Sequence, residues 1–142
     1  MRTAKDLVPT GSDASRRRHY LDRAAQLGVM RAGDVLDLGC GTGHHVADMA
    51  ALAFPAESFD LVTAFDSITQ LPKEEHGRLL RRISRWLRPR GGFVANLGSG
   101  WDARTNRRLV EAAGLDLLLD VVETTVEDGG PVTFQWVIAR KP

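Results

Sequence analysis

The sequence predicts an α/β fold with a mixed sheet of about five strands flanked by helices. Two observations support a parallel part: apolar runs of strand length alternate with helical patterns, and "DVLDLG" and "GGFVANLG" each end in glycine. The third observation concerns the end of the chain, where two long apolar runs are joined by Asp-Gly-Gly-Pro. That turn signal predicts an antiparallel hairpin as the last part of the sheet.

The length and net charge of the chain limit the domain organisation and the binding partners that we expect. A chain of 142 residues with 43% hydrophobic and 26% charged residues fits one domain, 1–142, with residues 1–11 expected as a loose N-terminal segment. Nineteen basic and eighteen acidic residues give a net charge of +1, so we expect no nucleic-acid and no membrane partner. The single cysteine, Cys40, and the absence of a secretory signal favour a cytoplasmic protein.

The first helix is predicted in "SDASRRRHYLDRAAQLG", with Ser12 or Asp13 as N-cap and Gly28 as its stop. Apolar side chains from Tyr20 to Leu27 give it one apolar side. The basic residues 16–19 are predicted to be a solvated face rather than a nucleic-acid patch.

Two buried strands come next, in "DVLDLG" and "FDLVTAF". Between them, residues 46–54 carry an apolar helical spacing and predict a helix. "KEEHGRLLRRISRWLRPRGG" predicts an amphipathic helix that ends at Pro89 and a glycine turn. Within that helix His76 is expected to be exposed and Trp86 to lie in the core.

The third strand is "GGFVANLG", and "DARTNRRLVEAAGL" predicts a further helix with Asp102 as N-cap and Gly114 as stop. Trp136, in the closing hairpin, is expected in the core. Trp101 could line a pocket.

Three glycines, Gly39, Gly41 and Gly43, stand at the end of the first predicted strand and just beyond it. Without Cβ atoms the backbone can approach a ligand closely, and a helix beginning after this turn would present unpaired N–H groups. The spacing is G-x-G-x-G, which differs from the G-x-G-x-x-G of dinucleotide-binding enzymes.

Together "VLDLGCGTG", "LAFPAESFDLV", "RISRWLRPRGGFVANLG", "RRLVEAAGL" and "VTFQWVIARKP" resemble the class I S-adenosylmethionine-dependent methyltransferases, especially small bacterial members that act on small molecules. The resemblance implies a Rossmann-like fold and S-adenosylmethionine as cofactor. It also implies that the glycines contact the methionine portion of the cofactor, supported by Asp37, and that Asp48, with Met49 beside it, lies near the adenine.

Measured against that family, the sequence looks shortened at two places. Only four residues separate Gly43 from Asp48, where relatives have two further strands, and one crossover alone needs about a dozen residues. The family's ribose-binding acid therefore has no counterpart at its usual place. Asp66 could take over that contact, although an ordinary loop aspartate is an equal alternative. A second gap, at residues 99–101, removes the segment that covers the substrate in relatives.

Loss of two strands would leave "DVLDL" at an edge of the sheet, so we expect a homodimer or a swapped oligomer that covers it. The residues Cys40, His44, His45 and Asp48 match no established zinc spacing, and no metal site is predicted. The function predicted is a truncated methyltransferase-like protein acting on a small molecule if active. The alternatives are a non-catalytic remnant that serves as an assembly or binding module, and cofactor-independent chemistry in the space left by the deletions.

Overall fold

The computed structural model describes residues 12–30, 32–39, 52–97 and 102–142. In chain order the elements are α1 (Ser12–Gln26), β1 (Val35–Asp37), β2 (Phe59–Ala64), the short 3-10 helix η2 (Ile68–Gln70), α3 (Lys73–Trp86), β3 (Leu87–Leu97), α4 (Ala103–Ala112), β4 (Asp116–Glu127) and β5 (Gly130–Arg140).

The strands form a five-stranded mixed sheet in the order β1-β2-β3-β5-β4. Strands β1, β2 and β3 run parallel, whereas β5 is antiparallel to both β3 and β4. The predicted fold class is therefore confirmed, including the antiparallel hairpin, whose strands are joined at Asp128 and Gly129. As expected, β1 lies at one edge of the described sheet.

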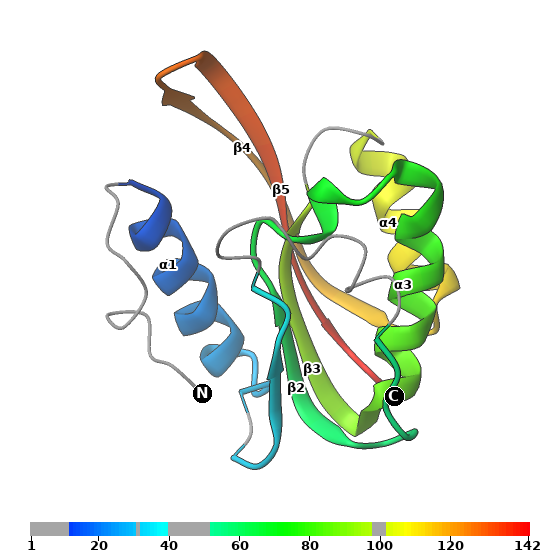
Figure 1. Cartoon of the computed structure of the whole chain (residues 1–142). Helices are drawn as coiled ribbons and strands as arrows, with labels where there is room; N and C mark the ends of the chain where they lie inside the picture. The colour runs from blue at the N-terminus through cyan, green and yellow to red at the C-terminus, as the bar shows by residue number, and fades with distance from the viewer. Residues whose placement is uncertain (1–11, 31, 40–51, 98–101) are drawn as a thin grey trace.

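Helices cover both faces of the sheet. Figure 1 shows α1 on one face and α3 with α4 on the other, and the end of the β4–β5 hairpin extends beyond these helices. Each face has its own apolar core. Trp86 belongs to the core under α3 and α4, and Trp136 to the core under α1, where it stacks on Tyr20 at 4.6 Å between ring centroids. The prediction that both tryptophans are buried is confirmed.

The helix boundaries follow local chemistry at several predicted positions. Gly28 and Gly114 adopt positive φ angles of 78° and 91° just after α1 and α4, which glycine does at little steric cost. Asp102 caps α4, and its carboxylate accepts a hydrogen bond of 2.7 Å from the Thr105 backbone N–H. These three predictions are confirmed.

The prediction that the third helix ends at Pro89 is wrong, because α3 ends at Trp86 and β3 begins at Leu87. The expected turn is instead an irregularity inside β3: Phe59 pairs with Leu87, but Leu61 pairs with Gly92. Arg90, in the intervening segment, has a φ of 70°.

The expectation of an exposed His76 is also wrong. This side chain is only 4% exposed, and its Nε2 donates to the Leu71 carbonyl oxygen at 3.0 Å. A buried imidazole needs such a partner to offset the loss of water. The partner comes from the turn before α3, which the charge pattern of the helix does not reveal.

The helix predicted over residues 46–54 falls mostly outside the described residues, but its end is wrong, because residues 52–55 form no regular element. The Phe54 ring packs edge-on against Phe59 and Trp86, each at 5.1 Å between centroids. Pro55 also disfavours a helical conformation at the residue before it.

Candidate functional site

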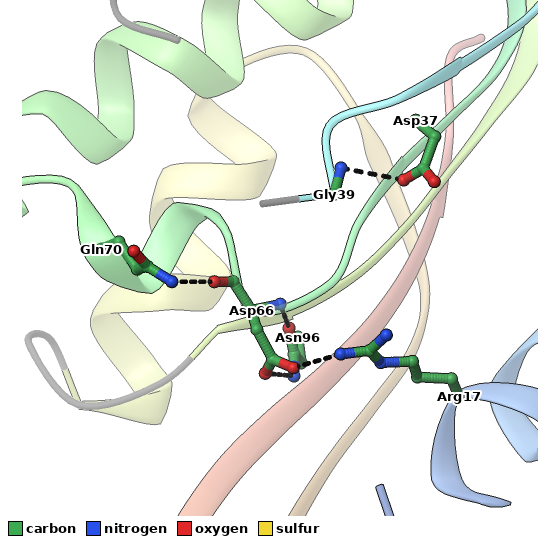
Figure 2. Close-up of polar contacts among 6 residues, drawn as sticks. All are labelled: Arg17, Asp37, Gly39, Asp66, Gln70 and Asn96. Atoms are coloured by element: carbon green, nitrogen blue, oxygen red, sulfur yellow. Dashed lines mark hydrogen bonds and ion pairs between the residues drawn. The ribbon is translucent and has the colours of Figure 1, made fainter. Parts of the chain in front are cut away.

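The carboxyl ends of the three parallel strands meet at one edge of the sheet, which is where open α/β sheets bind ligands. Asp37 ends β1, Asp66 comes just after β2, and Asn96 is near the end of β3. Figure 2 shows these residues together with Arg17, Gly39 and Gln70 at this edge. Among the residues in this view, the sequence analysis predicted Asp37, Gly39 and Asp66 as cofactor-binding residues.

The start of the glycine turn is held by Asp37. Its Oδ1 accepts hydrogen bonds from the Gly39 backbone N–H at 2.9 Å and from the Thr63 hydroxyl at 3.0 Å. A Cβ placed on Gly39 would lie 3.1 Å from the same oxygen, which is tighter than an ordinary contact. The carboxylate can close onto the turn because residue 39 has no side chain.

The other predicted cofactor-binding residues, Gly41, Gly43, Asp48 and Met49, lie outside the described residues, as do Cys40, His44, His45 and Trp101.

Asp66 is held from three directions by Arg17, Gln70 and Asn96, and we call these four residues the Asp66 cluster. Asn96 Nδ2 donates to Asp66 Oδ1 at 2.7 Å, while Asn96 Oδ1 accepts from the Asp66 backbone N–H at 2.6 Å. Arg17 Nη2 donates to Asp66 Oδ2 at 2.6 Å, and Gln70 Nε2 donates to the Asp66 carbonyl at 3.0 Å (Figure 2).

Asp66 has a φ of 57°, a left-handed conformation that few non-glycine residues adopt and that aspartate tolerates better than most. Backbone strain of this kind is frequently found at ligand-binding positions. Here two reciprocal hydrogen bonds with the buried Asn96 hold Asp66 in this conformation.

The predicted solvated face of α1 needs correction, because Arg16 and Arg17 are both partly buried and form ion pairs. Arg17 binds Asp66, and its guanidinium lies 5.7 Å from the Phe65 ring centroid. Arg16 binds Glu123 of β4, which also accepts a hydrogen bond from the Tyr20 hydroxyl. Burial raises the pKa of Tyr20 above its usual value, more than the nearby arginines lower it. These contacts fix α1 across the sheet.

A cavity of about 570 Å³ lies beside this edge, between the hairpin and the start of α4. It is lined by Thr69, Leu97, Asp102, Ala103, Asn106, Val122, Pro131, Val132, Thr133, Phe134 and Gln135. The pKa of Asp102 lies below its usual value, chiefly because the Thr105 backbone N–H donates to its carboxylate. Asp102 is therefore ionised at neutral pH.

A network of amides underlies the cavity. Gln135 Oε1 accepts from Asn106 Nδ2 at 2.9 Å. Gln135 Nε2 donates to Asp120 Oδ1 at 2.6 Å and to the Ala103 carbonyl at 3.1 Å. Arg107 pairs with Asp120 at 3.2 Å. Asn106 and Gln135 are both buried, so this network joins α4 to the hairpin.

Sequence reasoning missed Arg17, Asn96 and the cavity. Asn96 carried one usable signal, because it is a polar residue in the otherwise apolar "FVANLG". Arg17 carried none, since it is 49 residues from Asp66 in the chain. Across the described ranges, no group of three or more His, Cys, Asp or Glu residues could hold a metal ion, and no helix there is long and apolar enough to span a membrane.

Comparison with known proteins shows which families and structures this chain resembles. A family model described as "Methyltransferase domain" matches residues 44–95. A search of curated proteins gave no match.

Solved structures with the same fold include several methyltransferases. The 1,6-didemethyltoxoflavin-N1-methyltransferase of Burkholderia thailandensis, solved with 1,6-didemethyltoxoflavin and S-adenosylhomocysteine, is 17% identical with a TM-score of 0.63, covering 91% of this chain and 79% of that one. A SAM-dependent methyltransferase of Methanosarcina mazei is 14% identical with a TM-score of 0.61, covering 82% and 96%. The cyclase SpnF is 19% identical with a TM-score of 0.63, covering 91% and 81%.

These matches confirm the resemblance to class I S-adenosylmethionine-dependent methyltransferases. The chain has their fold, and the segment 44–95 matches the methyltransferase-domain model.

Proposed function

We propose that this chain is a reduced methyltransferase that binds S-adenosylmethionine and transfers its methyl group to a small molecule. The observation that carries the proposal is the turn after β1. Asp37 binds the backbone N–H of Gly39 at the carboxyl end of the strand, where the resemblance places the acid and the first glycine of the cofactor site. The family-model match over residues 44–95 supports it.

Different residues are proposed to hold different parts of the cofactor. Gly39, Gly41 and Gly43, supported by Asp37, would contact the methionine portion. Asp48 and Met49 would lie near the adenine.

Asp66 would take the ribose hydroxyls in place of the family's usual acid. Its side chain is 32% exposed and pairs with both Arg17 and Asn96. Because a carboxylate offers about four acceptor sites, Asp66 can keep both partners and still accept hydroxyl donors. The contacts that Asp66 makes are therefore compatible with a bound ribose.

Bound S-adenosylmethionine supplies a methyl group already activated by its sulfonium, so the protein needs no side-chain nucleophile. The task of the chain is to hold donor and acceptor in line, and correct orientation alone can supply a large part of the rate. Residues at the carboxyl ends of β1 and β2 would hold the donor. An acceptor would have to lie on the side of β3 and the hairpin.

We also propose that the chain lacks two internal segments found in relatives, and that it forms a homodimer or swapped oligomer. The place of β1 at the edge of the described sheet supports this, since an apolar edge strand presents backbone groups that a second chain can pair. Light scattering of the purified protein across micromolar concentrations should give twice the chain mass. A constant monomer mass would contradict the proposal. A cytoplasmic location is proposed on the single cysteine alone.

The alternative function is a non-catalytic assembly or binding module that uses the same edge. The observation that favours it is the edge position of β1 in the described sheet. A cyclase also shares this fold, so the fold alone does not fix a methyl-transfer reaction.

Calorimetric titration with S-adenosylmethionine and S-adenosylhomocysteine separates the two functions. We expect about one site per chain with micromolar affinity, roughly −8 kcal/mol. An Asp37→Ala variant should lose most of this affinity, because the Gly39 N–H then has no acceptor in the carboxylate. Transfer of an isotopically labelled methyl group to a substrate panel then tests catalysis. Absence of heat up to millimolar ligand would favour the binding-module alternative.

A further inference from the structure

The cavity between the hairpin and α4 has the dimensions of a small-molecule site. Its volume of about 570 Å³ lies inside the range in which small ligands and cofactors are bound. Within the part of the chain that the structure describes, its lining includes no residue of the Asp66 cluster and neither Asp37 nor Gly39. Leu97 and Thr69 bring it to the carboxyl ends of β3 and β2.

The walls of the cavity are mainly apolar. They comprise Leu97, Ala103, Val122, Pro131, Val132 and Phe134. Val122 is 52% exposed. A ligand that covered this wall would remove apolar surface from water, and the free energy gained is proportional to the area covered.

Several polar groups at the cavity already have partners within the protein. The Gln135 amide is fully engaged with Asn106, Asp120 and the Ala103 carbonyl. The hydroxyl of Thr133 pairs with that of Thr124 at 2.9 Å. Recognition through many hydrogen bonds is therefore disfavoured, because it would require breaking this network.

The charge of the described lining disfavours anionic ligands. Among the described residues that line the cavity there is no Lys, Arg or His, and the carboxylate of Asp102 is the formal charge present. Arg104 and Arg108 are exposed on α4 and do not line it, but their charges also help to lower the pKa of Asp102. An anionic ligand in the cavity would face the Asp102 carboxylate with no cation among the described lining residues, which is unfavourable. A cation would instead be attracted by Asp102.

We infer that this cavity binds an uncharged or cationic, mainly apolar small molecule and rejects anions. The ligand class rests on the cavity alone. The assignment of this ligand as the methyl acceptor rests on the proposed function, because the cavity lies beside the edge at which the methyl donor would be held.

Three probes of similar size and different charge test the ligand class: 2-phenylethanol, 2-phenylethylamine, which is cationic at neutral pH, and phenylacetate. Each is titrated into the full chain by ligand-detected NMR at low salt. We expect saturable binding of the alcohol and the amine, and binding of phenylacetate weaker by about tenfold or more, or about 1.4 kcal/mol. Failure of all three to bind, or equal binding of phenylacetate, would overturn the inference.

The chain offers a matched pair of variants for locating the site. Val122 and Val126 are both exposed on β4, at 52% and 80%, but only Val122 lines the cavity. Because both positions are open, a tryptophan at either should leave the fold intact. Val122→Trp should weaken probe binding about tenfold, and Val126→Trp should leave it unchanged. Equal effects of the two variants would place the ligand elsewhere and refute the inference.

Charge selectivity is tested with Asp102→Asn, since asparagine is as good an N-cap as aspartate and keeps α4 capped. This variant should bind the amine less well and the alcohol as before. If the amine binds equally well, Asp102 is not the source of selectivity. Titration of every variant with S-adenosylhomocysteine separates this inference from the proposed function, because probe binding and cofactor binding can each fail without the other.

Discussion

Replacement of Asp66 by alanine should destabilise the protein in a way that the structure makes quantitative. The substitution removes the acceptor of Asn96 Nδ2, and Asn96 is fully buried. An unsatisfied buried donor costs about 1–3 kcal/mol. Alanine also tolerates the left-handed conformation at φ 57° less well than aspartate, by about 1 kcal/mol. The partly exposed contact with Arg17 adds at most about 1 kcal/mol. We expect a total loss of about 3 kcal/mol.

Asp66→Asn is the matched control. Its side-chain oxygen can still accept from Asn96, and asparagine tolerates the left-handed region, so we expect a loss of only about 1 kcal/mol. This difference decides how the ribose contact should be tested. A fall in cofactor affinity in Asp66→Ala could reflect a disturbed site, whereas a fall in Asp66→Asn at nearly normal stability would indicate a role of the carboxylate itself.

Urea unfolding followed by circular dichroism measures both losses, and each 1 kcal/mol should also lower Tm by about 2–4 °C for a chain of this size. Adding Arg17→Met to Asp66→Ala should cost less than the sum of the single changes, because the two side chains share one interaction. If Asp66→Ala unfolds within about 0.5 kcal/mol of the natural chain, the cluster does not stabilise the fold and the reasoning fails.

Three further predictions concern packing and capping. Trp136→Ala should cost about 3–5 kcal/mol in urea unfolding, because the ring is buried against Tyr20 and Phe65; a loss below about 1 kcal/mol would contradict this packing. Gly92→Ala should lower Tm, since its Cβ would lie 2.6 Å from the Val29 carbonyl oxygen, whereas Gly129→Ala, with nothing within 4 Å, should not; equal Tm values would refute the contact. The folded-state pKa of Asp102 lies below the ordinary 3.8, so the stability that this carboxylate contributes should be complete above pH 3.8 and disappear as pH falls through the lower folded value. In urea unfolding, Asp102→Ala should therefore differ from the natural chain most at neutral pH. A difference that stays constant down to the lowest pH would argue against the cap.

Hydrophobic periodicity was sufficient to predict most of the fold. The spacing around Ile83 and Trp86 placed α3 correctly on the sheet, and the Asp-Gly turn placed the hairpin. Both signals are local, because a helix face or a two-residue turn is determined by neighbours in the sequence. The end of α3 was misplaced because Pro89 suggested a stop, while pairing with β2 already begins at Leu87.

Contacts between distant segments were beyond sequence reasoning. Arg16 and Arg17 stand in a polar run that is typical of a solvated helix face. They become partly buried because α1 lies across the sheet and brings them to Glu123 and Asp66. The same limit applies to the cavity, whose walls come from η2, β3, α4 and both hairpin strands.

The Asp66 cluster shows that α1 is part of the candidate site. One side chain of α1 reaches the carboxyl end of β2 and is held there together with a residue of β3, so three elements far apart in sequence share one polar contact. A shortening of the chain on the β1 side would leave this contact and the cavity beside the hairpin unchanged, because both are built from β2 onward and from α1. The part of the site that such a shortening does affect is the donor side, next to the glycine turn. Under the proposal that two segments are missing, the first loss should lower cofactor affinity. The second, expected at residues 99–101, should change the acceptor side, because Leu97 and Asp102 on either side of it both line the cavity.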